Sequence, residues 1–244
     1  MNPILFSAAK GAERTMLAQH VRANNLSHAD TVGFKALMEH STPMRLEGSG
    51  FLTSVTSRTN SSINNFAQGE DIRTERPLDV AINGDGFITL EGIEDEPAEL
   101  YTRAGNFRLD GNGQLYLGER RVMSTDGPMV LPDFEFVSVS SNGLVSITPI
   151  GGEASLEVGA LKLVKPENEQ MTMHASGHFV PKGGQVLAED FNVQIRSGYL
   201  EASNVSSLEE LVSIMSLTRQ YEMQIEVMAS ADEIAQIGNK LLKA

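Results

Sequence analysis

The sequence predicts an α+β fold, in which an all-β central domain is flanked by long N- and C-terminal helices that pair in the assembly. Two observations at the chain ends support this: apolar residues recur at helical spacing over residues 2–27 and again over about 207–242. A third comes from the middle, where residues 76–198 alternate in short runs separated by Gly-rich turns. The central domain is therefore expected to be a hairpin-rich sandwich or a distorted barrel.

Composition excludes several classes of function. The 244 residues are 41% hydrophobic, which is enough for a core, and the net charge is −13. Without a basic face, neither nucleic acid nor an anionic membrane is an expected partner. The absence of cysteine removes thiol catalysis, thiolate metal sites and disulfides. The first residues lack the pattern of a cleaved signal peptide, and no apolar run has the roughly 18 residues of a membrane span.

The N-terminal helix has a narrow apolar seam made mostly of small residues. Asn2 is a suitable cap and Pro3 suits the first helical position. Small seam residues allow close approach of another helix but bury little area, so this helix needs partners. The seam residues, spaced alternately by four and three, are Leu5, Ala9, Ala12, Met16, Gln19, Ala23 and Leu26.

The helix ends in the stretch "NNLSHADTVGFKA". Asn24 and Asn25 weaken the helix, Gly33 allows a backbone conformation that larger residues avoid, and Phe34 offers an apolar contact. Spacing alone indicates an ordinary helix C-terminus followed by a hydrophobic contact. Residues 36–75 then read as an extended, partly strand-like connector that is rich in Ser, Thr, Asn and Gly.

Several β-hairpins are expected in the central region. "LDVAINGDGFITL" surrounds Asn83-Gly84, a type I′ turn signal. "NFRLDGNGQLYL" and "FVSVSSNGLVSI" have the same design, "SLEVGALKLV" adds more strand, and "HFVPKGGQVLA" reads as another hairpin.

The C-terminal helix is expected to begin with a capping box, Ser207 with Glu210, and to be roughly 50 Å long. Two adjoining apolar stripes are more than one partner helix could cover. The alternative is a helix lying across its own β domain, against which its length argues. One stripe contains Leu211, Ile214, Thr218, Tyr221, Ile225, Met228 and Ala235, and the other contains Leu217, Val227, Ala231, Ile234, Gly238 and Leu241.

No candidate for catalysis or metal binding is convincing. Ser7 and Lys10 have an S-x-x-K spacing but lie in the first helix. His174 and His178 have a metal-ligand spacing but lie among strands without a third ligand. Asp110 begins a loop like that of an EF-hand, but no Glu stands at its twelfth position. We therefore expect no enzyme activity, no metal and no cofactor.

The chain resembles the bacterial flagellar rod and hook family in three motifs that occur in the right order. These are "ANNLSHADTVGFKA", the pair "RPLDVAINGDGFITL" and "YTRAGNFRLDGNGQL", and "SGYLEASNVSSLEELVSIMSLTRQYEMQIEVMASADE". The resemblance covers nearly the whole chain, and "LKLVKPEN" and "YEMQIEVM" are similar to the proximal-rod members. Val32 stands where the family often has Pro, and His28 where it often has Asn.

The resemblance implies a structural subunit of the basal-body rod, the shaft that transmits motor torque across the periplasm to the hook. It implies export in the unfolded state by the flagellar type III apparatus, and partners that include other rod proteins and copies of the chain. The implied segments are 1–35 (rod-core helix and turn), 36–75 (connector), 76–198 (β domain) and 199–244 (pairing helix).

The resemblance also gives a predicted assembly interface and a predicted turn. The turn residues are Thr31, Gly33 and Phe34. The interface residues are Leu5, Ala9, Ala12, Met16, Ala23, Asn24, Asn25, Leu26, Leu211, Ile214, Leu217, Tyr221, Ile225, Met228 and Ile234.

Two alternatives remain at this stage. One is another axial subunit, of the distal rod or of hook type, which would share the same end motifs. The other is a periplasmic carbohydrate-active or carbohydrate-binding β protein. The second would need clustered aromatics or a carboxylate pair, whereas aromatic residues make up 6% of the chain, with no Trp, and "EGIEDEPAEL" reads as a solvated acidic loop.

Overall fold

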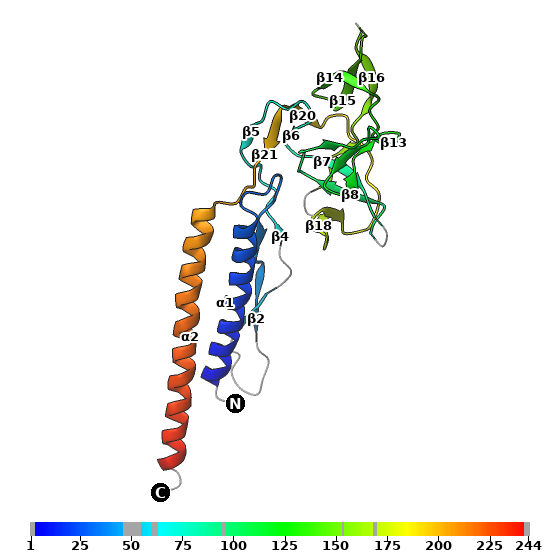
Figure 1. Cartoon of the computed structure of the whole chain (residues 1–244). Helices are drawn as coiled ribbons and strands as arrows, with labels where there is room; N and C mark the ends of the chain where they lie inside the picture. Colours follow the sequence, from blue (N-terminus) through cyan, green and yellow to red (C-terminus); the bar gives the residue numbers. More distant parts are fainter. Residues whose placement is uncertain are drawn as a thin grey trace. The chain divides into compact units, whose positions relative to one another are not determined.

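The computed structural model has two terminal helices that pack together, and the chain between them in sequence forms many small antiparallel sheets (Figure 1). This confirms the predicted fold class. The chain forms two compact units: residues 1–29, 36–65 and 205–244 belong to unit 1, and residues 30–35 and 66–204 to unit 2. The structure describes residues 3–45, 55–59, 63–93, 96–152, 154–167 and 170–241.

Unit 1 is built on two antiparallel helices, α1 (Pro3–Ser27) and α2 (Ser207–Leu241), which lie side by side (Figure 1). Its connector segment forms two short antiparallel ladders. β1 (Leu37–Met38) pairs with β4 (Ile63–Asn64), and β2 (Ser41–Arg45) pairs with β3 (Val55–Thr59). The first part of the predicted connector is thus strand-like, as expected from its composition.

Small and polar residues line the contact between α1 and α2. The Thr15 hydroxyl lies 3.2 Å from Oε1 of Gln224, and the Gln19 amide donates to the Thr218 hydroxyl at 2.9 Å. A Cβ atom on Gly11 would lie 2.9 Å from the Gln224 amide nitrogen, so glycine permits this close approach. Polar pairs inside an apolar seam are a means of fixing helix register.

The cap of α2 lies one residue earlier than the sequence suggested. Ser206, not Ser207, accepts from the backbone N–H of Glu209 through its hydroxyl, at 3.4 Å, and from that of Glu210 through its carbonyl, at 3.0 Å. Because two serines are adjacent in "SSLEE", either could cap the helix. With Ser206 as the cap, the Glu210 side chain takes no part in a capping box with Ser207 and pairs with Arg22 of α1 instead.

Unit 2 contains seventeen short strands in the described part of the chain. Their bounds are β5 (Asp71–Arg73), β6 (Val80–Asn83), β7 (Phe87–Glu91), β8 (Glu99–Thr102), β9 (Arg108–Leu109), β10 (Leu115–Leu117), β11 (Arg120–Arg121), β12 (Met123–Ser124), β13 (Gly127–Pro128), β14 (Phe134–Val139), β15 (Leu144–Pro149), β16 (Leu156–Ala160), β17 (Leu163–Val164), β18 (Met171–Met173), β19 (Phe179–Pro181), β20 (Gln194–Ser197) and β21 (Tyr199–Glu201). The widest sheet has the order β17-β7-β8-β19-β18, and β14-β15-β16 form a second.

Two of the predicted hairpins are confirmed and two are wrong. β9 pairs with β10, and β14 pairs with β15 around Asn142-Gly143. The Asn83-Gly84 hairpin is wrong, because β6 pairs with the distant β20 while β7 pairs with β8 and β17. β19 also does not pair with the segment after it, but with β18 before it. Alternation identifies a strand, whereas the partner of that strand is decided by contacts far away in sequence.

The core of unit 2 consists of two groups of buried side chains. The smaller group contains Phe87, Tyr101, Val164, Met171 and Phe179, and the half-buried Phe66 packs against it. The rings of Phe66, Phe87 and Phe179 have centroids 5.3 to 5.8 Å apart. The larger group comes from four of the sheets and from the segments between their strands, and contains Val80, Ile82, Ile88, Leu90, Leu100, Phe107, Leu115, Leu117, Val122, Met129, Leu131, Val145, Ile147, Leu161, Leu163, Val180, Val193 and Ile195.

The acidic segment around residues 91–99 is fastened by ion pairs, which corrects its interpretation as a solvated loop. Glu91 pairs with Arg121, Glu96 pairs with Arg120 at 2.6 Å, and Glu99 pairs with Lys162 at 2.6 Å. The last two pairs are largely buried. Cations that are distant in sequence thus pair with the three carboxylates of Glu91, Glu96 and Glu99.

The half-buried ring of His178 makes the stability of unit 2 depend on pH. Burial, with the nearby positive charge of Arg120, lowers the pKa of His178 to about 4, from an ordinary value of 6.5. Between pH 4 and pH 6.5, His178 binds a proton in the unfolded chain but stays neutral in the folded unit. This contribution to stability is therefore present above about pH 6.5 and lost as the pH falls to about 4.

Between pH 6.5 and pH 4, we expect the free energy of unfolding of the wild-type chain to fall by about 1–2 kcal/mol more than that of the His178→Gln variant. Urea unfolding at several pH values measures this difference. His20→Gln, on an exposed position of α1, is the matched control and should follow the wild type. Parallel pH profiles for wild type and His178→Gln would contradict the prediction.

Candidate assembly interface and junction

In unit 1, Asn25 ties α1 to both the connector and α2. Its side-chain amide donates to the Leu37 carbonyl at 2.9 Å and accepts from the Leu37 N–H at 2.8 Å. The same amide donates to Glu210 at 3.1 Å, and Arg22 adds a second donor to that carboxylate. Asn25 is 1% exposed, so a single side chain at the end of α1 satisfies three polar groups in unit 1.

We expect Asn25→Ala to cost unit 1 about 2–3 kcal/mol, because it leaves the buried Glu210 carboxylate and the Leu37 peptide groups short of partners. Asn24→Ala is the matched control, because Asn24 is exposed and should be nearly neutral. Loss of helical signal on heating, followed by circular dichroism at 222 nm, compares the two. Equal midpoints for both variants would rule out this role of Asn25.

Pairing of α1 with α2 leaves much of the predicted interface uncovered. Of the predicted residues, Ala12 and Asn25 are buried within unit 1, and Leu26, Ile214, Leu217, Tyr221 and Met228 are half-buried. The exposed ones are Leu5, Ala9, Met16, Ala23, Asn24, Leu211, Ile225 and Ile234. The face of α1 that contacts α2 therefore includes Gly11, Thr15 and Ala18, which lie beside the predicted seam. The larger apolar side chains stay at the surface.

In unit 2, three distant segments meet at what we call the junction: residues 31–35, 66–70 and 201–204. The Gly33 N–H donates to the Glu201 carbonyl at 2.8 Å, and the Ala202 N–H donates to the Glu70 carbonyl at 2.8 Å. Gly33 has φ +69°, and a Cβ atom there would lie 2.3 Å from the Ala104 backbone nitrogen. Only glycine fits, both for its left-handed conformation and for the close backbone approach. Of the predicted turn residues, Gly33 is buried, Phe34 is half-buried and Thr31 is exposed.

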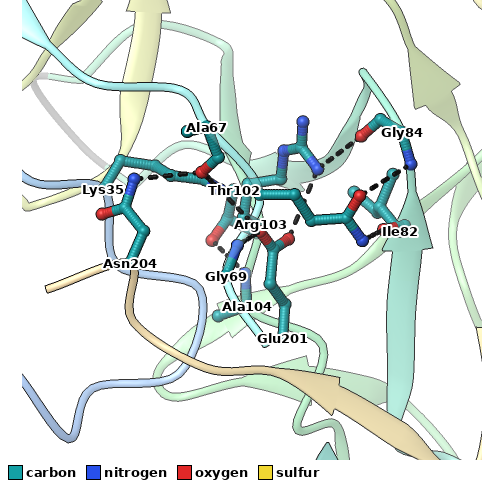
Figure 2. A network of polar contacts seen from close by, with 11 residues as sticks. Lys35, Ala67, Gly69, Ile82, Gly84, Thr102, Arg103, Ala104, Glu201 and Asn204 are labelled. Carbon is teal, nitrogen blue, oxygen red and sulfur yellow. Dashed lines mark hydrogen bonds and ion pairs between the residues drawn. The ribbon is translucent and has the colours of Figure 1, made fainter. Parts of the chain in front are cut away.

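A buried carboxylate lies at the centre of the junction (Figure 2). Glu201 accepts from the Lys35 ammonium at 2.5 Å and from the Gly69 N–H at 3.0 Å through one oxygen, and from Arg103 at 3.3 Å through the other. Lys35 also donates to the Ala67 carbonyl at 2.7 Å, and Arg103 to the Gly84 carbonyl at 2.8 Å. Lys35 and Glu201 are 0% exposed and Arg103 is 1% exposed.

Burial acts on both cations of this network. Burial lowers the pKa of Lys35, and the Glu201 carboxylate opposes that change while Arg103 adds to it. Burial likewise lowers the pKa of Arg103, with Glu201 and then Asp85 opposing. The Arg103 guanidinium lies 5.2 Å from the centre of the Phe87 ring, which supplies part of its contact. One buried carboxylate thus serves two buried cations.

The residues weighed for other chemistry do not form a site. His174 lies 3.0 Å from the Ser176 hydroxyl within a turn, and Asp110 caps its own loop by accepting from the N–H groups of Asn112 and Gln114. Within the described ranges, no group of three His, Asp or Glu side chains could hold a metal ion. No helix in the described part of the chain is long and apolar enough to span a membrane.

Comparison with known proteins gives matches along the whole chain. Residues 81–147 match a protein-family model described as "Flagellar hook protein FlgE/F/G D1 domain", and residues 196–241 match "Flagellar basal body rod FlgEFG protein C-terminal". The flagellar basal-body rod protein FlgF of Salmonella typhimurium is 31% identical over 99% of both chains, and that of Escherichia coli is 30% identical over the same share. The rod protein FlgG of Buchnera aphidicola subsp. Schizaphis graminum is 27% identical over 97% of this chain and 98% of its own.

A pair of long helices that leaves large apolar side chains uncovered, joined in sequence to a β unit, is typical of a subunit that assembles through its helices. The chain belongs to the flagellar basal-body rod FlgE/F/G family, with FlgF proteins among its similar relatives. It is a non-enzymatic basal-body rod protein, and membership of that family implies assembly with other rod proteins.

Sequence reasoning identifies two of the three junction segments as motifs, residues 31–35 and 201–204, but neither the segment 66–70 nor the chemistry of the junction. Lys35 and Glu201 were recognised only as positions within motifs, and Arg103 was not singled out at all. The sequence around them gives one signal: each is a charged residue among apolar or small residues, as in "GFKA", "YTRAG" and "GYLEAS". A charge in such a place needs a partner, and the partner cannot be found from spacing.

Proposed function

We propose that this chain is a segment of the proximal rod, the part of the flagellar shaft nearest the motor. The observation that carries the proposal is the apolar surface of α2 that remains after pairing with α1. Leu208 is 72% exposed, Met215 58% and Ile234 69%. So much large apolar surface on one pair of helices requires a further partner. Neighbouring helices of other rod subunits and of other copies of the chain are that partner.

Each of the four predicted segments has its own proposed role. Residues 1–35 and 199–244 supply the helices of the rod core, 36–75 form the connector, and 76–198 form the outer β domain. Asn24, Asn25 and Leu26 end the core helix. Thr31, Gly33 and Phe34 make the turn by which torque passes between the core helix and the β domain. The close backbone packing of Gly33 and the buried Lys35–Glu201 pair support this role, because both fix residues 31–35 in one position while the junction is closed.

Localisation and export follow from the same proposal. The subunit acts in the periplasmic part of the basal body, reaches it unfolded through the flagellar type III export apparatus, and keeps its N-terminal segment uncleaved. A chain without cysteine suits this route, because no disulfide has to form or be reduced on the way.

A distal-rod role is the second candidate, favoured by one observation: FlgG proteins match the chain over nearly the same length as FlgF proteins, at 27–28% identity against 27–31%. The position of the segment in the shaft separates the two candidates.

Electron microscopy of basal bodies from a deletion strain of the source bacterium tests the proposal. We expect rings with a rod that is already interrupted within its proximal part, so that the whole distal part is missing as well, and restoration of the full rod by the wild-type gene. Rods that lack only their distal end would favour the second candidate. Complete rods and hooks in the deletion strain would refute both.

A further inference from the structure

The junction contains more buried positive than buried negative charge, and one hydrogen-bond donor of Arg103 is unused. Two buried cations, Lys35 and Arg103, share the one buried carboxylate of Glu201. Asp85 adds negative charge near Arg103, but it is largely exposed and lies 3.9 Å from Lys165. Within the described residues, the buried Nε of Arg103 has no hydrogen-bond partner. Arg103 therefore holds Glu201 by a single 3.3 Å contact while an adjacent donor is unused.

We propose that Arg103 is a stand-by counter-ion for Glu201, which makes residues 31–35 a releasable latch. While the latch is closed, Lys35 is the main partner of Glu201, at 2.5 Å. When the latch opens, Lys35 leaves and returns to water, and Arg103 takes over the carboxylate with its unused Nε–H. Removing one partner of a buried ion pair normally strands the other charge at a large cost. Here the second cation removes most of that cost.

The latch is an inference about how the junction assigned under the proposed function opens, and it rests on that role for its use. Opening frees the segment that leads to α1 without disturbing the core of unit 2, whose buried apolar residues do not include residues 31–35. A chain that arrives unfolded could then complete its β unit first and close the latch last, when Lys35 meets Glu201 from 166 residues away.

Amide hydrogen exchange of the purified full-length chain tests the latch, with two amides as reporters. The Gly33 N–H donates to the Glu201 carbonyl and the Asn204 N–H donates to the Phe34 carbonyl at 3.4 Å, so both bonds break when the latch opens. Thr89 in β7, whose N–H donates to the Lys162 carbonyl directly before β17, is the reference. In the wild type we expect the reporters to exchange at least about tenfold faster than Thr89, through local opening.

Arg103→Met is the decisive variant. It leaves Lys35–Glu201 as a balanced pair and removes the stand-by, so opening would strand Glu201. We expect the reporter amides to slow by about tenfold relative to Thr89, which corresponds to 1.4 kcal/mol. Arg121→Met, which removes the arginine of the half-exposed Glu91 pair, is the matched control and should leave that ratio unchanged. An unchanged ratio in Arg103→Met, faster reporters relative to Thr89, or equal reporter and reference rates in the wild type would overturn the latch.

Lys35→Met keeps the inference testable if Arg103→Met does not fold. With the stand-by in place, Glu201 stays paired, and we expect a melting temperature within about 3 °C of the wild type. A fall of 10 °C or more would show that Arg103 does not take over the carboxylate, and would overturn the latch. Both measurements use the isolated chain, so their failure would leave the rod assignment, which is tested in basal bodies, untouched.

Discussion

Gly33→Val is expected to abolish swimming while the core of the β unit stays folded. A valine Cβ would lie 2.3 Å from the Ala104 nitrogen and 2.5 Å from the Arg103 carbonyl carbon, and backbone atoms cannot rotate away as a side chain can. The φ of +69° adds strain for a β-branched residue. Together these should cost the closed junction about 3 kcal/mol or more, which is enough to open it.

Two measurements check the Gly33 prediction. Soft-agar swimming reports function, and limited trypsin digestion reports the junction, because Lys35 is fully buried and can be cut only when the turn opens. Gly118→Val is the matched control: Gly118 also has positive φ, +61°, but nothing lies within 4 Å of the added Cβ. The control should swim and should resist trypsin at Lys35. Normal swimming of Gly33→Val would disprove the role given to the turn.

Glu201→Gln is expected to have the largest effect on stability. The substitution keeps the shape of the side chain but leaves Lys35 and Arg103 buried together without their shared carboxylate. Breaking a buried pair in this way costs about 3–5 kcal/mol. For a chain of this size the melting temperature should fall by roughly 10 °C.

Thermal unfolding followed by circular dichroism measures the effect of Glu201→Gln, with Glu91→Gln as control. Glu91 pairs with Arg121 where both side chains are about one-third exposed, so its loss should cost no more than about 1 kcal/mol. The double variant Lys35→Met/Glu201→Gln removes one of the two stranded cations and should recover part of the loss. Equal effects of Glu201→Gln and Glu91→Gln would mean that the buried network does not stabilise the unit.

Helices and strands were readable from the sequence where a local period is decisive. The helical spacing of small residues in α1 and of apolar residues in α2 places both helices to within a residue or two, because the period persists over twenty-five and thirty-five residues. Turns also followed from local chemistry at Asn142-Gly143, where φ of Gly143 is +84°. The cap of α2 was misplaced by one residue because two adjacent serines satisfy the same pattern.

Pairings over long distances were not readable in the same way. β6 carries a hairpin signal at Asn83-Gly84, yet its partner is β20, which begins 111 residues after Asn83. The Lys35–Glu201 pair and the contact of Asn25 with Glu210 join opposite ends of the chain. No local period encodes such contacts. The sequence shows only that a charge or an amide must be satisfied, and the folded chain decides by which partner.

The most direct test of the rod assignment uses the absence of cysteine from the chain. Ile234→Cys places the only thiol of the subunit on α2, at a position that is 69% exposed within the isolated chain. Labelling with a maleimide is compared between the purified subunit, basal bodies isolated from a strain that carries the variant and swims, and the same basal bodies after denaturation. We predict rapid labelling of the subunit, strong protection in intact basal bodies and full labelling after denaturation. Equally rapid labelling of intact basal bodies, or basal bodies that do not contain the chain, would contradict the account.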